Sequence, residues 1–170
     1  MKWIKPPVGW VKFNMDGSTI GNSRLVGGGG LICNEHGDWV MGFAISLGIT
    51  FGVMVELWSL KDGLMLASQL RISSICVELD AELIVLLLTN YSINNLMLEP
   101  LLYDCRTLLK KFHSSTIHHI FREANQCADA LAKFGATLSS DYVNFVNPLA
   151  VVDLLAFDKA ELYCNRLIRI

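Results

Sequence analysis

The chain has 170 residues, which is enough for one domain with a single hydrophobic core. Apolar residues make up 52% of it, but the longest aliphatic run, residues 83–88, is far too short to cross a membrane, so we expect no membrane partner. The net charge of −2 comes without a basic stripe, which excludes a protein that binds nucleic acid by electrostatic attraction alone.

The first ten residues contain two prolines and a glycine and are predicted to form an extended lead-in. Residues 11–15 alternate between apolar and polar side chains, which predicts a first strand. Asp16 ends this run on the face opposite the apolar side chains, and residues 17–24 are predicted to form a polar turn. Two further strands, joined by a loop of hairpin composition, are expected at 27–33 and 39–45.

Four consecutive glycines, residues 27–30, open the second strand. They lack the spacing of a phosphate-binding loop, so we interpret them as a bulge or a place where another backbone comes close. A helix is predicted over residues 55–70, with Glu56 at its start. Gly63 and Ala67 share a face with Glu56, and these small side chains would let the helix approach a sheet closely.

The rest of the chain alternates between predicted helices and strands. In order, they are a strand at 74–79, helices at 81–88 and 99–112, a strand at 116–121 and a helix at 124–134. The element order βββ-α-β-α-α-β-α predicts an α/β fold with a five-stranded mixed sheet and helices packed on it. We expect the domain to cover residues 11–137, with residues 138–170 forming a C-terminal extension that docks on it.

Cysteine usage and the N-terminus bear on the compartment. The five cysteines are odd in number and show no CxxC spacing, so we expect buried free thiols and no zinc site. The first seven residues lack an apolar signal segment. Both features predict an intracellular protein, and neither distinguishes nucleus from cytoplasm.

Four carboxylates lie where a strand or helix could direct them at a common site: Asp16, Glu56, Asp80 and Asp129. Clustered carboxylates repel one another, so bringing them together is unfavourable unless cations neutralise them. Hard oxygen ligands suit Mg²⁺ or Mn²⁺, and two such ions suit phosphodiester hydrolysis. The chain has 16 acidic residues, most of them ordinary surface charges, so the four gain weight only from their context.

That context is a set of short motifs in a fixed order. They are Asp16-Gly17, Val55-Glu56-Leu57-Trp58, Val77-Glu78-Leu79-Asp80 and Arg122-Glu123-Ala124-Asn125 followed by Ala128-Asp129-Ala130-Leu131-Ala132. On this topology the set resembles the type 1 ribonuclease H fold over residues 3–136. More narrowly, it is similar to the ribonuclease H-like domains of plant genomes that are related to non-LTR retrotransposons.

The resemblance implies a ribonuclease that cleaves the RNA strand of an RNA–DNA hybrid endonucleolytically. It also implies that the four acidic residues, Asp16, Glu56, Asp80 and Asp129, are catalytic and bind two Mg²⁺ ions, with Mn²⁺ as a substitute. The partner would be the hybrid itself, bound by a monomer or by part of a larger polyprotein. Asn14, Ser18, Asn22 and Arg122 are candidates for contacts with the substrate. For the first three a local structural role explains the residue equally well, and for Arg122 an ion pair does.

Several departures from the family pattern keep two alternatives open. The chain has no basic substrate-binding protrusion, and residues 49–55 before Glu56 are more apolar than the family pattern. Arg122 stands in a short segment where many type 1 enzymes have a loop rich in glycine and histidine. The first alternative is therefore a domesticated domain that binds nucleic acid weakly and cleaves poorly or not at all. The second is a protein-interaction module that uses residues 138–170.

Overall fold

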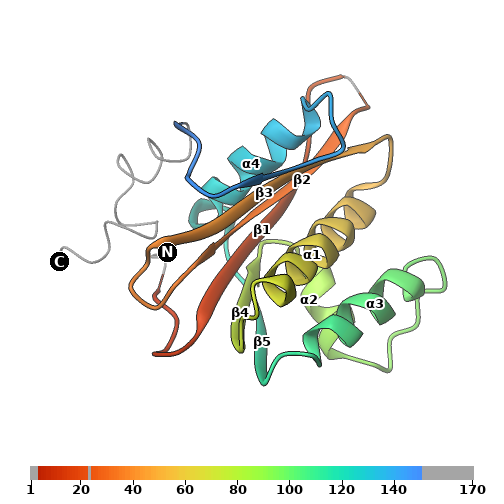
Figure 1. Ribbon diagram of the computed structural model, residues 1–170. Helices are drawn as coiled ribbons and strands as arrows, with labels where there is room; N and C mark the ends of the chain where they lie inside the picture. The colour runs from red at the N-terminus through yellow and green to blue at the C-terminus, as the bar shows by residue number, and fades with distance from the viewer. Residues whose placement is uncertain (1–3, 23, 151–170) are drawn as a thin grey trace.

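The protein is described from a computed structural model, which covers residues 4–22 and 24–150. Within these residues the centre of the molecule is a six-stranded sheet with the strand order β5-β4-β1-β2-β3-β6 (Figure 1). Strand β1 runs parallel to β4 and β4 parallel to β5, whereas the β1–β2, β2–β3 and β3–β6 pairs are antiparallel. The strands are β1 Val11–Thr19, β2 Val26–Cys33, β3 Trp39–Gly48, β4 Ser74–Leu79, β5 Ser114–His119 and β6 Tyr142–Phe145.

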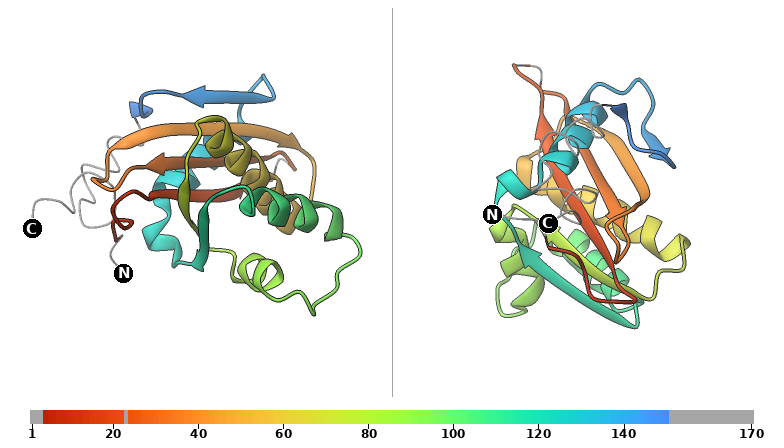
Figure 2. Two further views of the ribbon diagram at one scale, coloured as in Figure 1. Left: turned by 60° about the horizontal axis from the view of Figure 1, so that its bottom comes forward. Right: turned by 90° about the vertical axis from the view of Figure 1, so that its left-hand side faces the viewer.

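Helices cover both faces of this sheet. Helix α1 packs on one face together with α2 and α3, and α4 packs on the other (Figure 2). A short 3-10 turn, η1, leads into α4. The bounds are α1 Gly52–Gln69, α2 Glu82–Thr89, α3 Glu99–Leu109, η1 Arg122–Ala124 and α4 Gln126–Ala136. The predicted element order and the mixed α/β sheet with packed helices are therefore confirmed, with one strand added.

The glycine run lies in β2, at the point where both helices come closest to the sheet. Because side chains alternate along a strand, Gly27 and Gly29 face α4 and Gly28 faces α1. A Cβ atom at Gly27 would lie 2.0 Å from the backbone nitrogen of Ala136, and one at Gly28 would lie 1.8 Å from Ser59 Oγ. The interpretation of the run as a place of close backbone approach is confirmed, and both helices depend on it.

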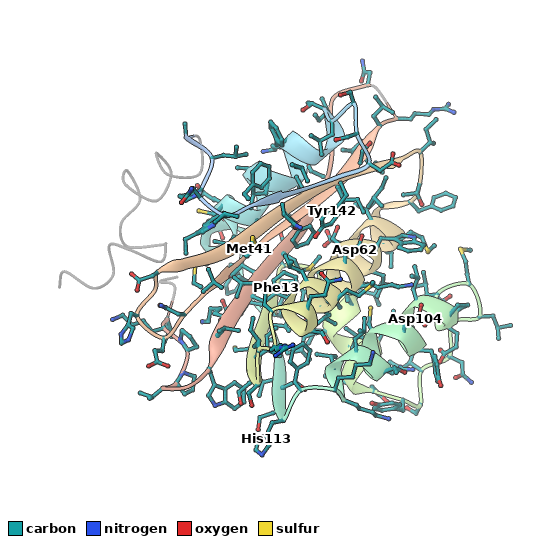
Figure 3. The ribbon with its side chains drawn as sticks, viewed as in Figure 1. Phe13, Met41, Asp62, Asp104, His113 and Tyr142 are labelled. Carbon is teal, nitrogen blue, oxygen red and sulfur yellow. The ribbon has the colours of Figure 1, made fainter. Side chains whose placement is uncertain are left out.

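The main core lies between the sheet and the layer formed by α1, α2 and α3. Phe13 of β1 is fully buried there and points from the sheet towards α1 (Figure 3). It packs against Gly63, where a Cβ atom would lie only 1.9 Å from its ring. The helix therefore approaches the sheet closely here, as its small residues predicted, and Gly63 leaves room for the aromatic ring of Phe13. The largest fully buried side chains are Phe13, Phe43, Met15, Ile32, Leu57, Leu60, Leu64, Ile75, Leu79, Ile84, Leu87 and Leu102.

Strand β1 is longer than predicted. The predicted turn at 17–24 is wrong for its first three residues, because Gly17, Ser18 and Thr19 continue to pair with β2. Asp16 therefore lies inside the strand rather than at its end, opposite Gly29. Asp16 and Ser18 can remain in the strand because their partners, Gly29 and Gly27, supply backbone pairing without competing side chains.

The sixth strand was not predicted. Strand β6 pairs antiparallel with residues 42–45 of β3 and lies in the segment assigned above to a docked extension. Only four residues long, it is too short to show a clear alternation of side chains. The sheet therefore continues beyond residue 137, and residues 151–170 of the expected extension lie outside the described residues.

The cysteines only partly match the prediction of free thiols. Cys76, Cys105 and Cys127 are buried and free, but the prediction is wrong for Cys33, which is disulfide-bonded. Within residues 4–22 and 24–150, none of the helices combines the length and apolar character that a membrane crossing requires.

The tight docking of α4 on β2 generates a prediction about stability. Gly27→Ala should lower the free energy of unfolding by at least about 2 kcal/mol, because its new methyl group would collide with the backbone of α4. Gly52→Ala is the matched control, since a Cβ atom there meets nothing within 4 Å, and it should leave stability unchanged or slightly raised. Urea unfolding of the two variants measures this. Equal stabilities would show that α4 can shift away from the sheet at little cost.

Candidate active site

Two of the four predicted carboxylates meet because of the register between β1 and β4. The parallel pair aligns Asn14 with Glu78. Continuing that register by two residues places Asp16 beside Asp80, which follows the last residue of β4. Since residues two apart in a strand point to the same side, the two carboxylates occupy neighbouring places at the point where β4 ends and β1 continues.

The third carboxylate, Glu56, comes from the N-terminal part of α1. It reaches the first two because Gly17 has no side chain: a Cβ atom there would lie 2.6 Å from Val55 Cγ1. As a result, one carboxylate oxygen from each of Asp16, Glu56 and Asp80 lies within 4.8 Å of the other two. We call these three residues the acidic triad.

The acidic triad consists of one buried and two partly buried carboxylates, and none of the three forms an ion pair among the described residues. Asp16 is only 3% exposed, and its Oδ1 accepts a hydrogen bond from the Gly17 amide at 2.9 Å. Its other oxygen, Oδ2, and Glu56 Oε2 are buried without a hydrogen-bond partner among the described residues. Burial, followed by the neighbouring carboxylates, raises the pKa of Asp16 well above its ordinary value, and burial followed by Asp80 does the same for the pKa of Glu56.

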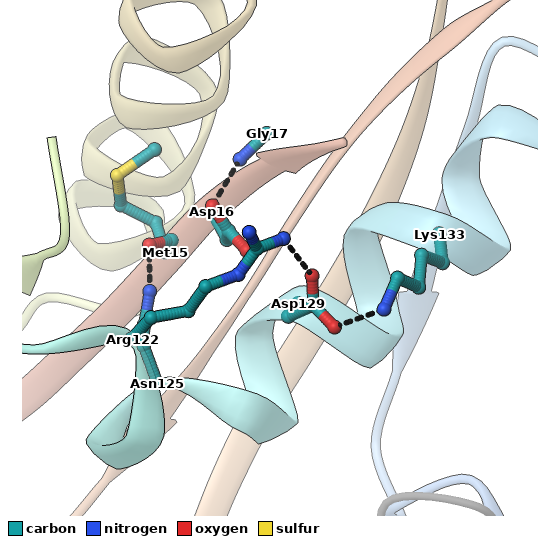
Figure 4. Close-up of polar contacts among 7 residues, drawn as sticks. All are labelled: Met15, Asp16, Gly17, Arg122, Asn125, Asp129 and Lys133. Atoms are coloured by element: carbon teal, nitrogen blue, oxygen red, sulfur yellow. Dashed lines mark hydrogen bonds and ion pairs between the residues drawn. The ribbon is translucent and has the colours of Figure 1, made fainter. Parts of the chain in front are cut away.

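Asp129 lies next to the acidic triad but in a different electrostatic setting. It sits in the first turn of α4, and its negative charge contributes to the raised pKa of Asp16. Both of its oxygens are already paired with cations (Figure 4): Oδ1 with Arg122 Nη2 at 3.2 Å and Oδ2 with Lys133 Nζ at 2.5 Å. The structure thus brings three of the four predicted acids together, with the fourth alongside and neutralised.

The acidic triad has the properties of a site for a hard divalent cation. It offers only carboxylate oxygens, the ligands that Mg²⁺ and Mn²⁺ prefer. Two of its buried oxygens lack hydrogen bonds, a costly state that a cation would relieve. The residues present therefore fit the metal ions that the sequence predicts.

The predicted substrate contacts fall into different environments. Asn14 is buried, and its Nδ2 donates to Glu78 Oε2 at 3.2 Å, which favours the structural explanation for this residue. Asn22 lies exposed in the turn after β1. Arg122 is exposed and forms the ion pair with Asp129, one of the two explanations that its sequence context left open.

Ser18 lines a pocket of about 310 Å³ that opens beside Glu56, between the ends of β1, α1 and α2. The walls of this pocket are largely apolar. The pocket is lined by Gly17, Ser18, Thr19, Gly52, Val53, Val55, Glu56, Ala81, Leu83 and Ile84. Its position leaves space for a molecule next to the acidic triad.

Sequence reasoning missed the roles of two residues around Asp129. Asn125, only 1% exposed, donates from Nδ2 to the backbone oxygen of Met15 at 2.8 Å and so fixes the start of α4 beside Asp16 (Figure 4). Lys133 of α4 pairs with Asp129. The i,i+4 spacing of Asp129 and Lys133 was a signal that could have revealed this pair.

The fold and the acidic triad together define a ribonuclease H-like domain, and comparison with known proteins agrees. Residues 14–135 match the family described as Reverse transcriptase-like, and the chain belongs to this family. It is 35% identical over 157 residues to a candidate ribonuclease H protein of Arabidopsis thaliana, covering 92% of this chain and 25% of that protein. The chain thus spans about a quarter of the length of this relative.

Solved structures share the same fold. The ribonuclease H1 of Halobacterium salinarum is 26% identical, with a TM-score of 0.69 over 74% of this chain and 96% of that one. The ribonuclease H1 named LC11, solved in complex with an RNA/DNA hybrid, is 23% identical, with a TM-score of 0.62 over 74% of this chain and 96% of that one.

The raised pKa values in the acidic triad predict that the metal-free protein loses stability as pH rises. The raised pKa values of Asp16 and Glu56 mean that the folded state holds protons which the unfolded state releases. Their contribution is therefore greatest below the ordinary carboxyl pKa and declines as pH rises towards the raised values. With metal removed by a chelator, the free energy of unfolding should fall between about pH 5 and about pH 8, and Asp16→Asn should reduce this fall by at least about 1 kcal/mol. Urea unfolding at both pH values tests it. If the free energy of unfolding falls as much in Asp16→Asn as in wild type, the pH dependence does not come from Asp16.

Binding of a divalent cation should reverse this effect. Saturating Mg²⁺ or Mn²⁺ should raise the melting temperature by roughly 5 °C or more, since the ion binds the folded state alone. Asp80→Asn should remove most of the rise, whereas Asp141→Asn, an exposed carboxylate, should keep it. Thermal unfolding with and without the ion measures the difference. A rise that survives both Asp16→Asn and Asp80→Asn would mean that the ions bind away from the acidic triad.

Proposed function

We propose that this chain is an endonuclease of the ribonuclease H type that cleaves the RNA strand of an RNA–DNA hybrid. The observation that carries the proposal is the acidic triad with two buried oxygens that lack partners among the described residues, Asp16 Oδ2 and Glu56 Oε2. The hybrid bound to LC11 ribonuclease H1 and the RNA/DNA hybrid bound to a foamy virus protease–reverse transcriptase support the choice of substrate. Membership of the Reverse transcriptase-like family supports an origin from a retroelement.

Asp16, Glu56 and Asp80 would hold the divalent cation, with Asp129 completing the set. Two ions held by these residues would supply activation of a water molecule for in-line attack on the phosphodiester and stabilisation of the leaving 3′ oxygen. The chain itself fixes the positions of the ligands. The Gly17 amide orients Asp16, α1 presents Glu56 from the side, and the end of β4 presents Asp80. Burial of these groups keeps their positions the same before and after substrate arrives.

RNA selectivity would come from contacts to 2′-hydroxyl groups beside the cleaved bond. Ser18 and Thr19 line the pocket next to Glu56 and supply hydroxyls and backbone groups there. Asn22 and Arg122 remain candidates for phosphate contacts because the side chains of both are exposed. We propose that the domain acts as a monomer or within a larger polyprotein.

A second candidate function is a domain that binds hybrid weakly and cleaves poorly. It is favoured by the surface of α2, α3 and the segment between them. That surface exposes large apolar side chains rather than the basic residues that would hold phosphates: Leu83, Leu86, Tyr91, Leu96, Met97 and Tyr103. The third reading, a protein-interaction module at residues 138–170, rests mainly on residues outside the described part of the chain.

The proposed activity predicts which products form and how much one substitution lowers the rate. A labelled RNA–DNA hybrid in low salt with Mg²⁺ or Mn²⁺ should yield 5′-phosphate and 3′-hydroxyl ends on the RNA strand, while duplex DNA stays intact. Asp80→Asn should reduce the rate at least about 100-fold because it removes a ligand charge at nearly constant volume. Asp141→Asn controls for loss of an exposed acid. Activity should decline steeply with salt, since electrostatic contacts to the phosphates weaken as salt rises.

Two results would contradict this proposal in different ways. Cyclic 2′,3′-phosphate ends would show attack by the RNA's own hydroxyl rather than by water. No cleavage under the most permissive conditions, together with binding of the hybrid in Ca²⁺, would favour the weakly binding domain instead.

A further inference from the structure

The four carboxylates of the site are not equivalent in their charge environment. Asp16 Oδ2 and Glu56 Oε2 are buried without partners among the described residues. Asp129 lies in the first turn of α4 and has a cation on each oxygen, Arg122 on Oδ1 and Lys133 on Oδ2. One part of the site therefore has no ion pair among the described residues, while the other is already paired with two cations of the chain itself.

The two ion pairs of Asp129 hold a carboxylate that is itself mostly shielded from water. The Asp129 side chain is 14% exposed, whereas those of Arg122 and Lys133 are 69% and 56% exposed, so solvent partly screens both pairs. Asp129 precedes Lys133 by four residues on α4, the favourable order for such a pair in a helix. A divalent cation that uses Asp129 must either displace one of these partners or bind beside both of their positive charges, and either is unfavourable.

We propose that Arg122 and Lys133 form a cationic clamp that sets the metal affinity of Asp129 and keeps it low in the absence of nucleic acid. The free protein then binds one divalent ion tightly at the acidic triad and a second ion weakly through Asp129. This inference rests on the proposed function only in that the four carboxylates bind divalent ions.

The two halves of the clamp differ in what else they can do. The Arg122 side chain is 69% exposed and belongs to η1, outside the helix that carries Asp129. Its planar guanidinium suits a phosphate group as well as a carboxylate, so a bound nucleic acid can draw it away from Asp129. Lys133 lies on the same helix as Asp129 and remains its neighbour in either state. Substrate would thereby weaken the clamp and strengthen binding of the second ion.

Calorimetric titration of the full chain with Mn²⁺, without nucleic acid, tests the clamp directly. Wild type should show one tight and one weak ion. Lys133→Gln should raise the affinity for the weakly bound ion roughly 3- to 10-fold, as expected for loss of one partly screened ion pair. It should leave the affinity for the tightly bound ion within about twofold of wild type. Lys133→Arg keeps the charge and should keep the second ion weak.

Two further variants make the result specific. Lys110→Gln removes one positive charge at the exposed end of α3, before β5 begins, and should change neither ion. Asp129→Asn should abolish the weak ion and retain the tight one, and adding Lys133→Gln to it should have no further effect on metal binding. Circular dichroism of each variant checks that the fold is intact.

The possible failures are distinguishable. Two results would overturn the clamp alone. One is that wild type binds two ions equally tightly. The other is that the weakly bound ion requires Asp129 but its affinity is unchanged by Lys133→Gln. If Asp16→Asn leaves metal binding unchanged, the acidic triad is not the metal site, and both proposals are contradicted. If binding of the second ion depends on Lys133 but the protein never cleaves the hybrid, the clamp is supported and only the proposed activity is contradicted.

Discussion

The site depends on how closely two helices can approach one strand from opposite sides. Strand β2 has glycines where α1 and α4 cross it, and the backbone of α4 occupies the space in which a Cβ atom of Gly27 would lie. This contact fixes the distance of each helix from the sheet. Because Glu56 belongs to α1 and Asp129 to α4, the same contact places an acidic residue on either side of Asp16. The glycines thus determine the geometry of a site to which they contribute no functional group.

A buried polar network next to the site holds the strands and α4 together. Lys12, only 3% exposed, pairs with Glu78 at 2.5 Å and also donates to the backbone oxygen of Ile4. Asn14 links Glu78 to Asn125. Such a network is costly to bury unless its members are paired, and removing one member leaves the others without a partner. It therefore favours one alignment of β1, β4 and the start of α4, the three segments that carry or precede Asp16, Asp80 and Asp129.

The order of elements could be predicted because each element has its own local pattern. The acids stood out for the same reason: Asp80 directly follows a strand, and Glu56 lies in the N-terminal part of a helix. What the sequence could not show depends on distant partners. Gly17 and Ser18 suggest a turn when considered alone, and they stay in β1 only because β2 pairs with them. Likewise, the state of Asp129 depends on Arg122, whose direction is set by the turn before α4 rather than by its neighbours in the chain.

The short strand β6 has a consequence for solubility. At the opposite border of the sheet, β5 is short and bears serines, a threonine and histidines, a composition that discourages pairing with other molecules. Strand β3 is ten residues long and much more apolar, and β6 covers its middle. A protein cut after residue 137 would expose those backbone groups as a template for another chain. Such a shortened protein would retain every carboxylate of the site and yet tend to self-associate, so the four residues of β6 protect the molecule against aggregation.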